Sequence, residues 1–75
     1  MIIQYETKNS LYEVDDEKKL IRRVGGVNPP TDNFGFDDDW IPYQEVEVGH
    51  RLTILFGTGR LTITSPLRSA KWLDR

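Results

Sequence analysis

The 75-residue chain contains no cysteine and a single histidine, His50. Without cysteine the protein can form neither disulfides nor thiolate zinc sites, and thiol catalysis is excluded. One imidazole also falls short of the histidine clusters that hold structural metals, so we expect no metal. The absence of cysteine is typical of a reducing compartment.

Long apolar runs and a strong charge of either sign are also missing. No apolar stretch approaches the roughly 20 residues that span a bilayer, and Met1 leads into an alternating segment without signal-peptide features. The formal net charge is −2, whereas general nucleic-acid affinity needs a basic surface. We therefore expect a cytoplasmic protein with neither a membrane nor a nucleic-acid partner.

The composition is that of one small folded domain. Hydrophobic residues make up 37% of the chain and aromatic residues 11%, which is too much for a disordered segment. A core of this size supplies only about 3–5 kcal/mol, and a partner subunit is a common source of additional stability. We therefore expect a homo-oligomer, in which Trp72 and Leu73 are covered by the barrel or by a second subunit.

The alternation of apolar and polar residues predicts short strands and no long helix. We expect strands over residues 1–7, 11–15, 19–24, 40–48, 51–56 and 60–65, with 67–73 as an edge strand. Such spacing is typical of a small antiparallel barrel or sandwich of SH3-like or OB-like size. Residues 1–24 would form a meander and 25–39 a long loop. A short helix over 15–24 remains possible, because Asp15 could cap it.

Two local features refine this all-β prediction. The alternation slips by one residue near Glu45, which predicts a bulge. Residues 57–59, Gly-Thr-Gly, join the clearest hairpin, since glycine reaches positive φ without steric cost. In this hairpin the apolar residues are expected on the covered face and the threonines on the other: Leu52, Ile54, Phe56, Leu61 and Ile63 against Thr53, Thr62 and Thr64.

No motif predicts catalysis. His50 follows a glycine in a turn, with no acid or serine beside it to form a nucleophile–base pair. The acidic run 37–39 fails the calcium-loop spacing and is expected to be a solvated turn. Residues 57–59 join two strands and lack the third glycine of a dinucleotide site. We therefore expect a non-enzymatic protein without a cofactor.

The long loop and its flanks, Arg22 to Tyr43, carry the candidate binding residues. Aromatic side chains interleaved with a few polar groups are typical of ligand sites and interface hot spots. Guanidinium groups at the start of the loop could hold phosphate or carboxylate bidentately. The candidate residues are Arg22, Arg23, Asn28, Phe34, Phe36, Trp40 and Tyr43.

An alternative is that these aromatics fold back as a lid over a small core. A chain of this length cannot leave all of them in water. We expect Trp40 to be largely buried and Phe34 or Phe36 to be the more exposed. The sequence leaves both possibilities open.

Several short motifs occur in a familiar order. They are Tyr12-Glu13-Val14-Asp15, Ile21-Arg22-Arg23, Asn28-Pro29-Pro30-Thr31, Trp40 with Tyr43, and Thr64-Ser65-Pro66. In this order the chain resembles small β-rich accessory proteins of actinobacterial phages, which generally have no assigned function. The resemblance implies a phage gene product that acts in the cytoplasm of a bacterial host, and it identifies no binding residue.

Two functional hypotheses follow. In the first, the protein is an oligomeric counter-defence sponge for a nucleotide signal, a small anionic ligand. Arg22 and Arg23 would hold its phosphates and Trp40 would stack on its base. In the second, it is an interaction module that modulates a host protein through the 25–43 loop or an edge strand.

Overall fold

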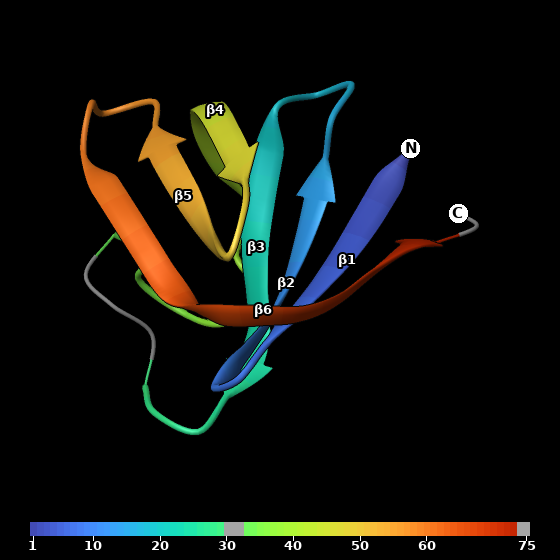
Figure 1. Ribbon diagram of the computed structural model, residues 1–75. Helices are drawn as coiled ribbons and strands as arrows, with labels where there is room; N and C mark the ends of the chain where they lie inside the picture. Colours follow the sequence, from blue (N-terminus) through green and yellow to red (C-terminus); the bar gives the residue numbers. More distant parts are fainter. Residues whose placement is uncertain (30–32, 74–75) are drawn as a thin grey trace.

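The computed structural model describes residues 1–29 and 33–73, which form an all-β protein (Figure 1). The strands are β1 (Ile2–Thr7), β2 (Ser10–Asp15), β3 (Leu20–Gly26), β4 (Ile41–Val48), β5 (Arg51–Phe56) and β6 (Leu61–Leu73). Consecutive strands pair antiparallel, and β6 pairs with β1, so the sheet closes into a barrel. The predicted small barrel is confirmed, and Leu20–Gly26 is a strand rather than part of a helix. In the described ranges no helix could cross a membrane.

β6 departs most from the prediction. Instead of two strands separated by Pro66, residues 61–73 form one continuous strand. Its first part pairs with β5 and its second with β1, and both ladders shift register near the changeover. Pro66 lies at this bend, where an interrupted ladder tolerates the missing N–H. The segment 67–73 is therefore the second half of one strand rather than a separate strand, and its ladder pairs are with β1 alone. It bends across the molecule and closes the barrel (Figure 1).

The core consists of inward-facing residues of β1 to β5 together with one loop aromatic, Phe34. The Phe34 ring lies 5.5 Å from that of Tyr12 and 5.2 Å from that of Phe56, the latter contact edge-to-face. Such aromatic contacts add to the free energy gained by burying the rings. The lid alternative therefore holds for this residue. The remaining core residues are Tyr5, Val14, Ile21, Tyr43, Leu52 and Ile54.

The faces of Leu61 and Ile63 are opposite to the prediction. In the β5–β6 ladder Ile54 pairs with Thr62, whereas Leu55 pairs with Leu61. Directly opposed residues share a face, so Thr62 points inward with Ile54, whereas Leu61 and Ile63 point outward. Leu61 is 55% exposed and Ile63 60% exposed.

The hairpin loop explains this register. The Phe56 N–H donates to the Arg60 carbonyl at 2.9 Å across residues 57–59, and Gly59 has a φ of 88°. A three-residue loop ending in a left-handed glycine places 56 opposite 60, and the rest of the ladder follows. The inward Thr64 hydroxyl is satisfied, because it accepts the Leu52 N–H at 3.1 Å and donates to the Ser65 carbonyl at 2.9 Å.

The predicted bulge near Glu45 is confirmed, because the β4–β5 register shifts between Tyr43 and Glu45. The seam between β3 and β4 is short, with Cα pairs only at Leu20–Pro42 and Ile21–Ile41 in the described part of the chain. Beyond these two pairs the facing edges of β3 and β4 have no ladder pairs with each other in the residues that the structure describes, so an edge-strand interaction stays as open as one through the loop.

Candidate interaction site

Arg23 ties the long loop to the barrel. Its side chain points inward, opposite Tyr12 in the β2–β3 ladder, and is only 4% exposed. Nη1 donates to Asp37 Oδ1 at 2.6 Å, and Nη2 donates to the Asn28 carbonyl. The Arg23 carbonyl in turn accepts the Asp38 N–H at 2.8 Å. One arginine thus holds both the outgoing and the returning arm of the loop.

Gly26 makes room for this guanidinium. A Cβ at Gly26 would overlap the Arg23 side chain and lie 2.6 Å from the Asn9 carbonyl oxygen. Contacts this short force neighbouring atoms to move. At Gly25, by contrast, a Cβ would meet nothing within 4 Å. Of the two adjacent glycines, only Gly26 therefore lies too close to its neighbours to accept a side chain without movement.

Arg22 points outward and holds the loop where it returns to β4. Its Nε and Nη2 both donate to Glu13 Oε1, at 2.9 and 2.6 Å, and Glu13 is buried. The guanidinium carbon also lies 4.9 Å from the centre of the Trp40 ring, in cation–π geometry. A third contact, of 3.7 Å, joins it to Asp38. The outward arginine therefore fixes the end of the loop just before β4.

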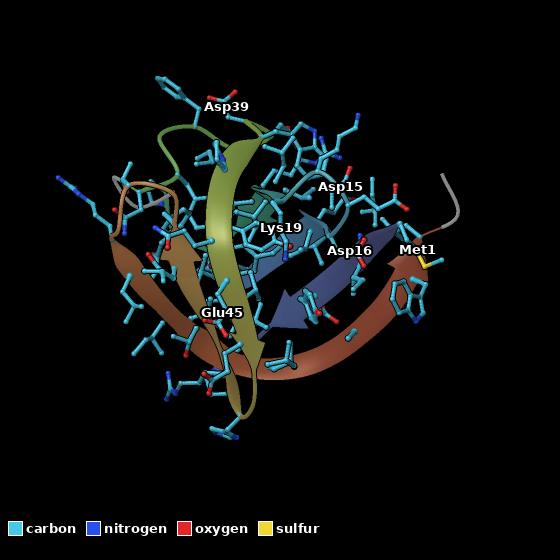
Figure 2. The ribbon with its side chains drawn as sticks, turned by 90° about the horizontal axis from the view of Figure 1, so that it is seen from above. Met1, Asp15, Asp16, Lys19, Asp39 and Glu45 are labelled. Carbon is cyan, nitrogen blue, oxygen red and sulfur yellow. The ribbon has the colours of Figure 1, made fainter. Side chains whose placement is uncertain are left out.

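Between Phe34, which is buried in the core, and Asp37, which is held by Arg23, the loop presents Phe36 to solvent. Phe36 is 76% exposed. It follows Gly35, whose φ is 70°, and precedes Asp37, whose carboxylate is held by Arg23. Asp38 also has a left-handed φ, 69°, which is unusual for a residue with a side chain. Such a conformation persists where its surroundings hold it, so Phe36 sits on a preorganised turn. Figure 2 shows neighbouring Asp39 near the start of β4, with Glu45 farther along the strand.

The predicted binding residues divide into three groups. Those buried in the barrel are Arg23, Phe34 and Tyr43. Those stacked on each other outside it are Arg22 and Trp40. Those left exposed are Asn28 and Phe36. Trp40 is 36% exposed and counts among the exposed large apolar residues, so the expectation that it is largely buried is wrong; Phe36, at 76%, is more exposed than Trp40, as expected.

Both guanidinium groups already bond to carboxylates, which bears on the anionic-ligand hypothesis. A phosphate that used the same N–H groups of Arg22 or Arg23 would displace Glu13 or Asp37. The sponge hypothesis therefore stays a prediction, because neither guanidinium is free of a carboxylate partner. The protein-interaction hypothesis needs no such displacement.

Two hollows in the surface lie near the loop. The smaller, about 180 Å³, is lined by Arg23 and Phe34 and by hydroxyl side chains of β6. Two of its lining side chains bond to each other, since Arg23 Nε donates to Ser10 Oγ at 3.4 Å. No buried side-chain nitrogen or oxygen in the described ranges lacks a hydrogen-bond partner. The larger hollow, about 400 Å³, lies along the β1–β2 turn and the end of β3. Among the described residues, neither hollow therefore contains a buried side-chain nitrogen or oxygen without a hydrogen-bond partner.

Other chemistry finds little support in the residues that the structure describes. They contain no cluster of three or more histidine and acidic side chains arranged to hold a metal. Burial raises the pKa of the Tyr5 and Tyr43 hydroxyls, and the negative charge of Asp16 adds to this effect. These tyrosines are therefore protonated across the neutral range.

Sequence reasoning missed the outward aliphatic residues of β6, Leu61 and Ile63. The signal that could have found them is the length of the Gly-Thr-Gly loop, which sets which residues oppose each other. Trp72, in contrast, was expected to need cover. It is 61% exposed, although it pairs with Ile3 in the β1–β6 ladder.

The chain was compared with known proteins. No family model matches it, and no curated protein or solved structure shows significant similarity to it.

Proposed function

We propose that this protein is a non-enzymatic protein-interaction module that anchors its partner through Phe36. The observation that carries the proposal is the 76% exposure of Phe36, on a turn that follows the buried Phe34 and precedes Asp37 and Asp38, which contact Arg23 and Arg22. Buried aromatic side chains dominate the energetics of many interfaces. A turn that is already ordered loses little conformational entropy on binding.

The charges beside Phe36 indicate the chemistry of the partner. Asp37 to Asp39 follow the aromatic ring, and two of these carboxylates already face Arg23 and Arg22. Asp39 forms no ion pair with another described residue. The proposed partner therefore has an apolar pocket for the ring and basic residues on its rim, because complementary charges favour encounter and register.

The proposed setting follows from the resemblance to phage accessory proteins. On that basis the partner is a protein of the bacterial host, met in the host cytoplasm, and the module modulates its activity. A counter-defence role fits this setting. Neither catalysis nor a cofactor forms part of the proposal.

Photocrosslinking from position 36 tests the proposal. A photoreactive phenylalanine analogue replaces Phe36, and the purified protein is illuminated in a lysate of the host bacterium. The same analogue at Val48, which is exposed at the far end of β4, is the control. We expect one crosslinked protein from position 36 and none from position 48. Excess unmodified protein should suppress the crosslink, whereas the Phe36→Ala variant should not.

The captured protein is then purified and its affinity measured directly. Removal of a central aromatic should weaken binding by about 2 kcal/mol or more, which is roughly thirtyfold. Equal binding of wild type and Phe36→Ala would refute the anchor role. A thermal shift produced by cyclic dinucleotides, in the absence of any crosslinked protein, would instead favour the sponge hypothesis.

A further inference from the structure

The outer surface of one barrel wall combines two kinds of side chain in parallel columns. β4, β5 and the first part of β6 lie side by side in this wall (Figure 1). Two outward rows cross it, each running from an acid on β4 to an aliphatic residue on β6. These rows, here called the β4–β6 face, are Glu47–Thr53–Ile63 and Glu45–Leu55–Leu61.

The aliphatic column exists because the hairpin register overrides the apolar pattern. Leu61 and Ile63 are more than half exposed, while Thr64 on the same strand is buried. Leu55 on β5 is half-buried and extends the apolar column towards the centre of the face. Contiguous exposed apolar side chains often mark interaction sites, and conflicts between local pattern and fold tend to occur at functional surfaces.

The acidic column runs parallel to the aliphatic one. Glu45 and Glu47 are exposed, and neither forms an ion pair within residues 1–29 and 33–73. Two strand spacings separate the columns, which is about 10 Å, and the two rows lie roughly 7 Å apart along the strands. An α-helix with its side chains is about 10 Å wide. A helix lying along β5 would therefore touch both columns at once.

We infer that the β4–β6 face is a second docking surface, which takes a cationic amphipathic helix of a partner protein. Aliphatic side chains on one flank of the helix would pack on Leu55, Leu61 and Ile63. Lysine or arginine residues on the other flank would face Glu45 and Glu47. Burial of the aliphatic contacts supplies affinity, and the charges set the orientation of the helix. This surface is independent of Phe36.

A second copy of the chain fits this face less well. If two such faces stacked about an axis perpendicular to the strands, the glutamate columns would oppose each other. If they stacked about an axis parallel to the strands, the glutamates would lie on the partner's aliphatic column. Like-charge contact and burial of an unpaired carboxylate are both unfavourable. The charge pattern therefore favours a basic partner over self-association.

A fluorescent helical peptide composed only of leucine and lysine, with the two residue types on adjacent flanks, is the probe. Its control replaces every lysine with glutamate. Binding to the full chain is measured by fluorescence anisotropy at two salt concentrations. We expect the leucine–lysine peptide to bind and to weaken with salt, and the leucine–glutamate peptide to show no binding.

Variants assign the binding to the face. The Leu61→Ser/Ile63→Ser variant should weaken binding about tenfold or more, because apolar burial is lost. The Glu45→Gln/Glu47→Gln variant should weaken it about three- to tenfold and reduce the salt dependence. Phe36→Ala and Glu6→Gln, on the loop and on β1, should leave the affinity unchanged, and circular dichroism confirms that each variant is folded.

Several outcomes would overturn the inference. One is equal binding of the two peptides, and another is unchanged affinity in both face variants. A third is concentration-dependent self-association of the chain that disappears in Leu61→Ser/Ile63→Ser, which would assign the face to a second copy. Because the Phe36→Ala variant is measured in the same assay, failure here does not affect the proposed role of the loop.

Discussion

At the residue scale, two adjacent arginines show how neighbouring side chains in a strand take opposite roles. Arg22 points outward to Glu13 and Trp40, whereas Arg23 points inward to Asp37 and the Asn28 carbonyl. Successive strand residues face opposite sides, so the pair holds the loop from both the outside and the inside of the barrel. Both arginines therefore support the site that presents Phe36, and neither is presented to solvent as a free guanidinium.

The two adjacent glycines offer a matched test of the contact around Arg23. We expect Gly26→Ala to destabilise the fold by about 1–3 kcal/mol, because a Cβ there collides with the guanidinium and a backbone carbonyl. Gly25→Ala should be neutral or slightly stabilising, since its Cβ meets open space and alanine restricts the unfolded chain. Urea denaturation of both variants provides the measurement. Equal destabilisation would show that the close approach is not the cause.

The buried tyrosines predict a loss of stability at high pH. The pKa values of Tyr5 and Tyr43 are raised above 10.0 in the folded state, first by burial and then by Asp16. The folded state therefore holds these protons more tightly than the unfolded state does. Their contribution to stability is complete below pH 10 and is lost as the pH rises through the folded-state pKa values.

Absorbance titration of tyrosinate, combined with denaturation series above pH 10, measures this effect. The Tyr5→Phe/Tyr43→Phe variant should lose less stability than wild type between pH 10 and pH 12, because phenylalanine does not titrate. Parallel stability curves for the two proteins would contradict the prediction. Tyr12→Phe provides a comparison at another buried tyrosine.

At the element scale, the register of the β5–β6 hairpin buries one isoleucine and exposes another, although both lie in alternating apolar and polar sequence. Ile54 is buried and Ile63 is exposed, because the three-residue loop sets the register. We expect Ile54→Ala to cost about 2–5 kcal/mol. Ile63→Ala should change stability by about 0.5 kcal/mol or less. Chemical denaturation of the two variants distinguishes this register from the predicted one, in which both residues would face the core and both substitutions would be costly.

The bend in β6 is the second feature at this scale. Because the strand changes partners near Pro66, one strand serves both ladders and closes the barrel. Prolines usually mark the ends of strands, which is why the sequence predicted two. A single proline can lie within a continuous strand where the ladder of backbone hydrogen bonds is already interrupted.

At the scale of the whole molecule, closure of the barrel does not cover every large apolar side chain. Trp72, which lies on the paired strand β6, is more than half exposed, and so is Met1 at the start of the chain. The homo-oligomer expected from the small size stays a prediction. Light scattering coupled to size-exclusion chromatography should give a mass above 8.7 kDa, and Trp72→Ser should shift it towards the monomer. A monomer at all concentrations would contradict this.

Much of the architecture could be read from local sequence. Alternation with a period of two located the strands within one or two residues, apart from the continuous β6, and the phase slip at Glu45 located the bulge. These features depend on neighbours in sequence, which is why a pattern reveals them. The all-β barrel class follows from the same regular spacing.

The tertiary structure alone decided which side chains reach the surface. A period of two says that neighbours face opposite ways, but it does not say which face is inside. The length of the hairpin loop turned Leu61 and Ile63 outward. Packing against Tyr12 turned Phe34 inward, and the ion pair between Asp37 and Arg23 holds the turn on which Phe36 is exposed. The candidate site could therefore be located in the 25–43 loop from the sequence, but its exposed residue could not.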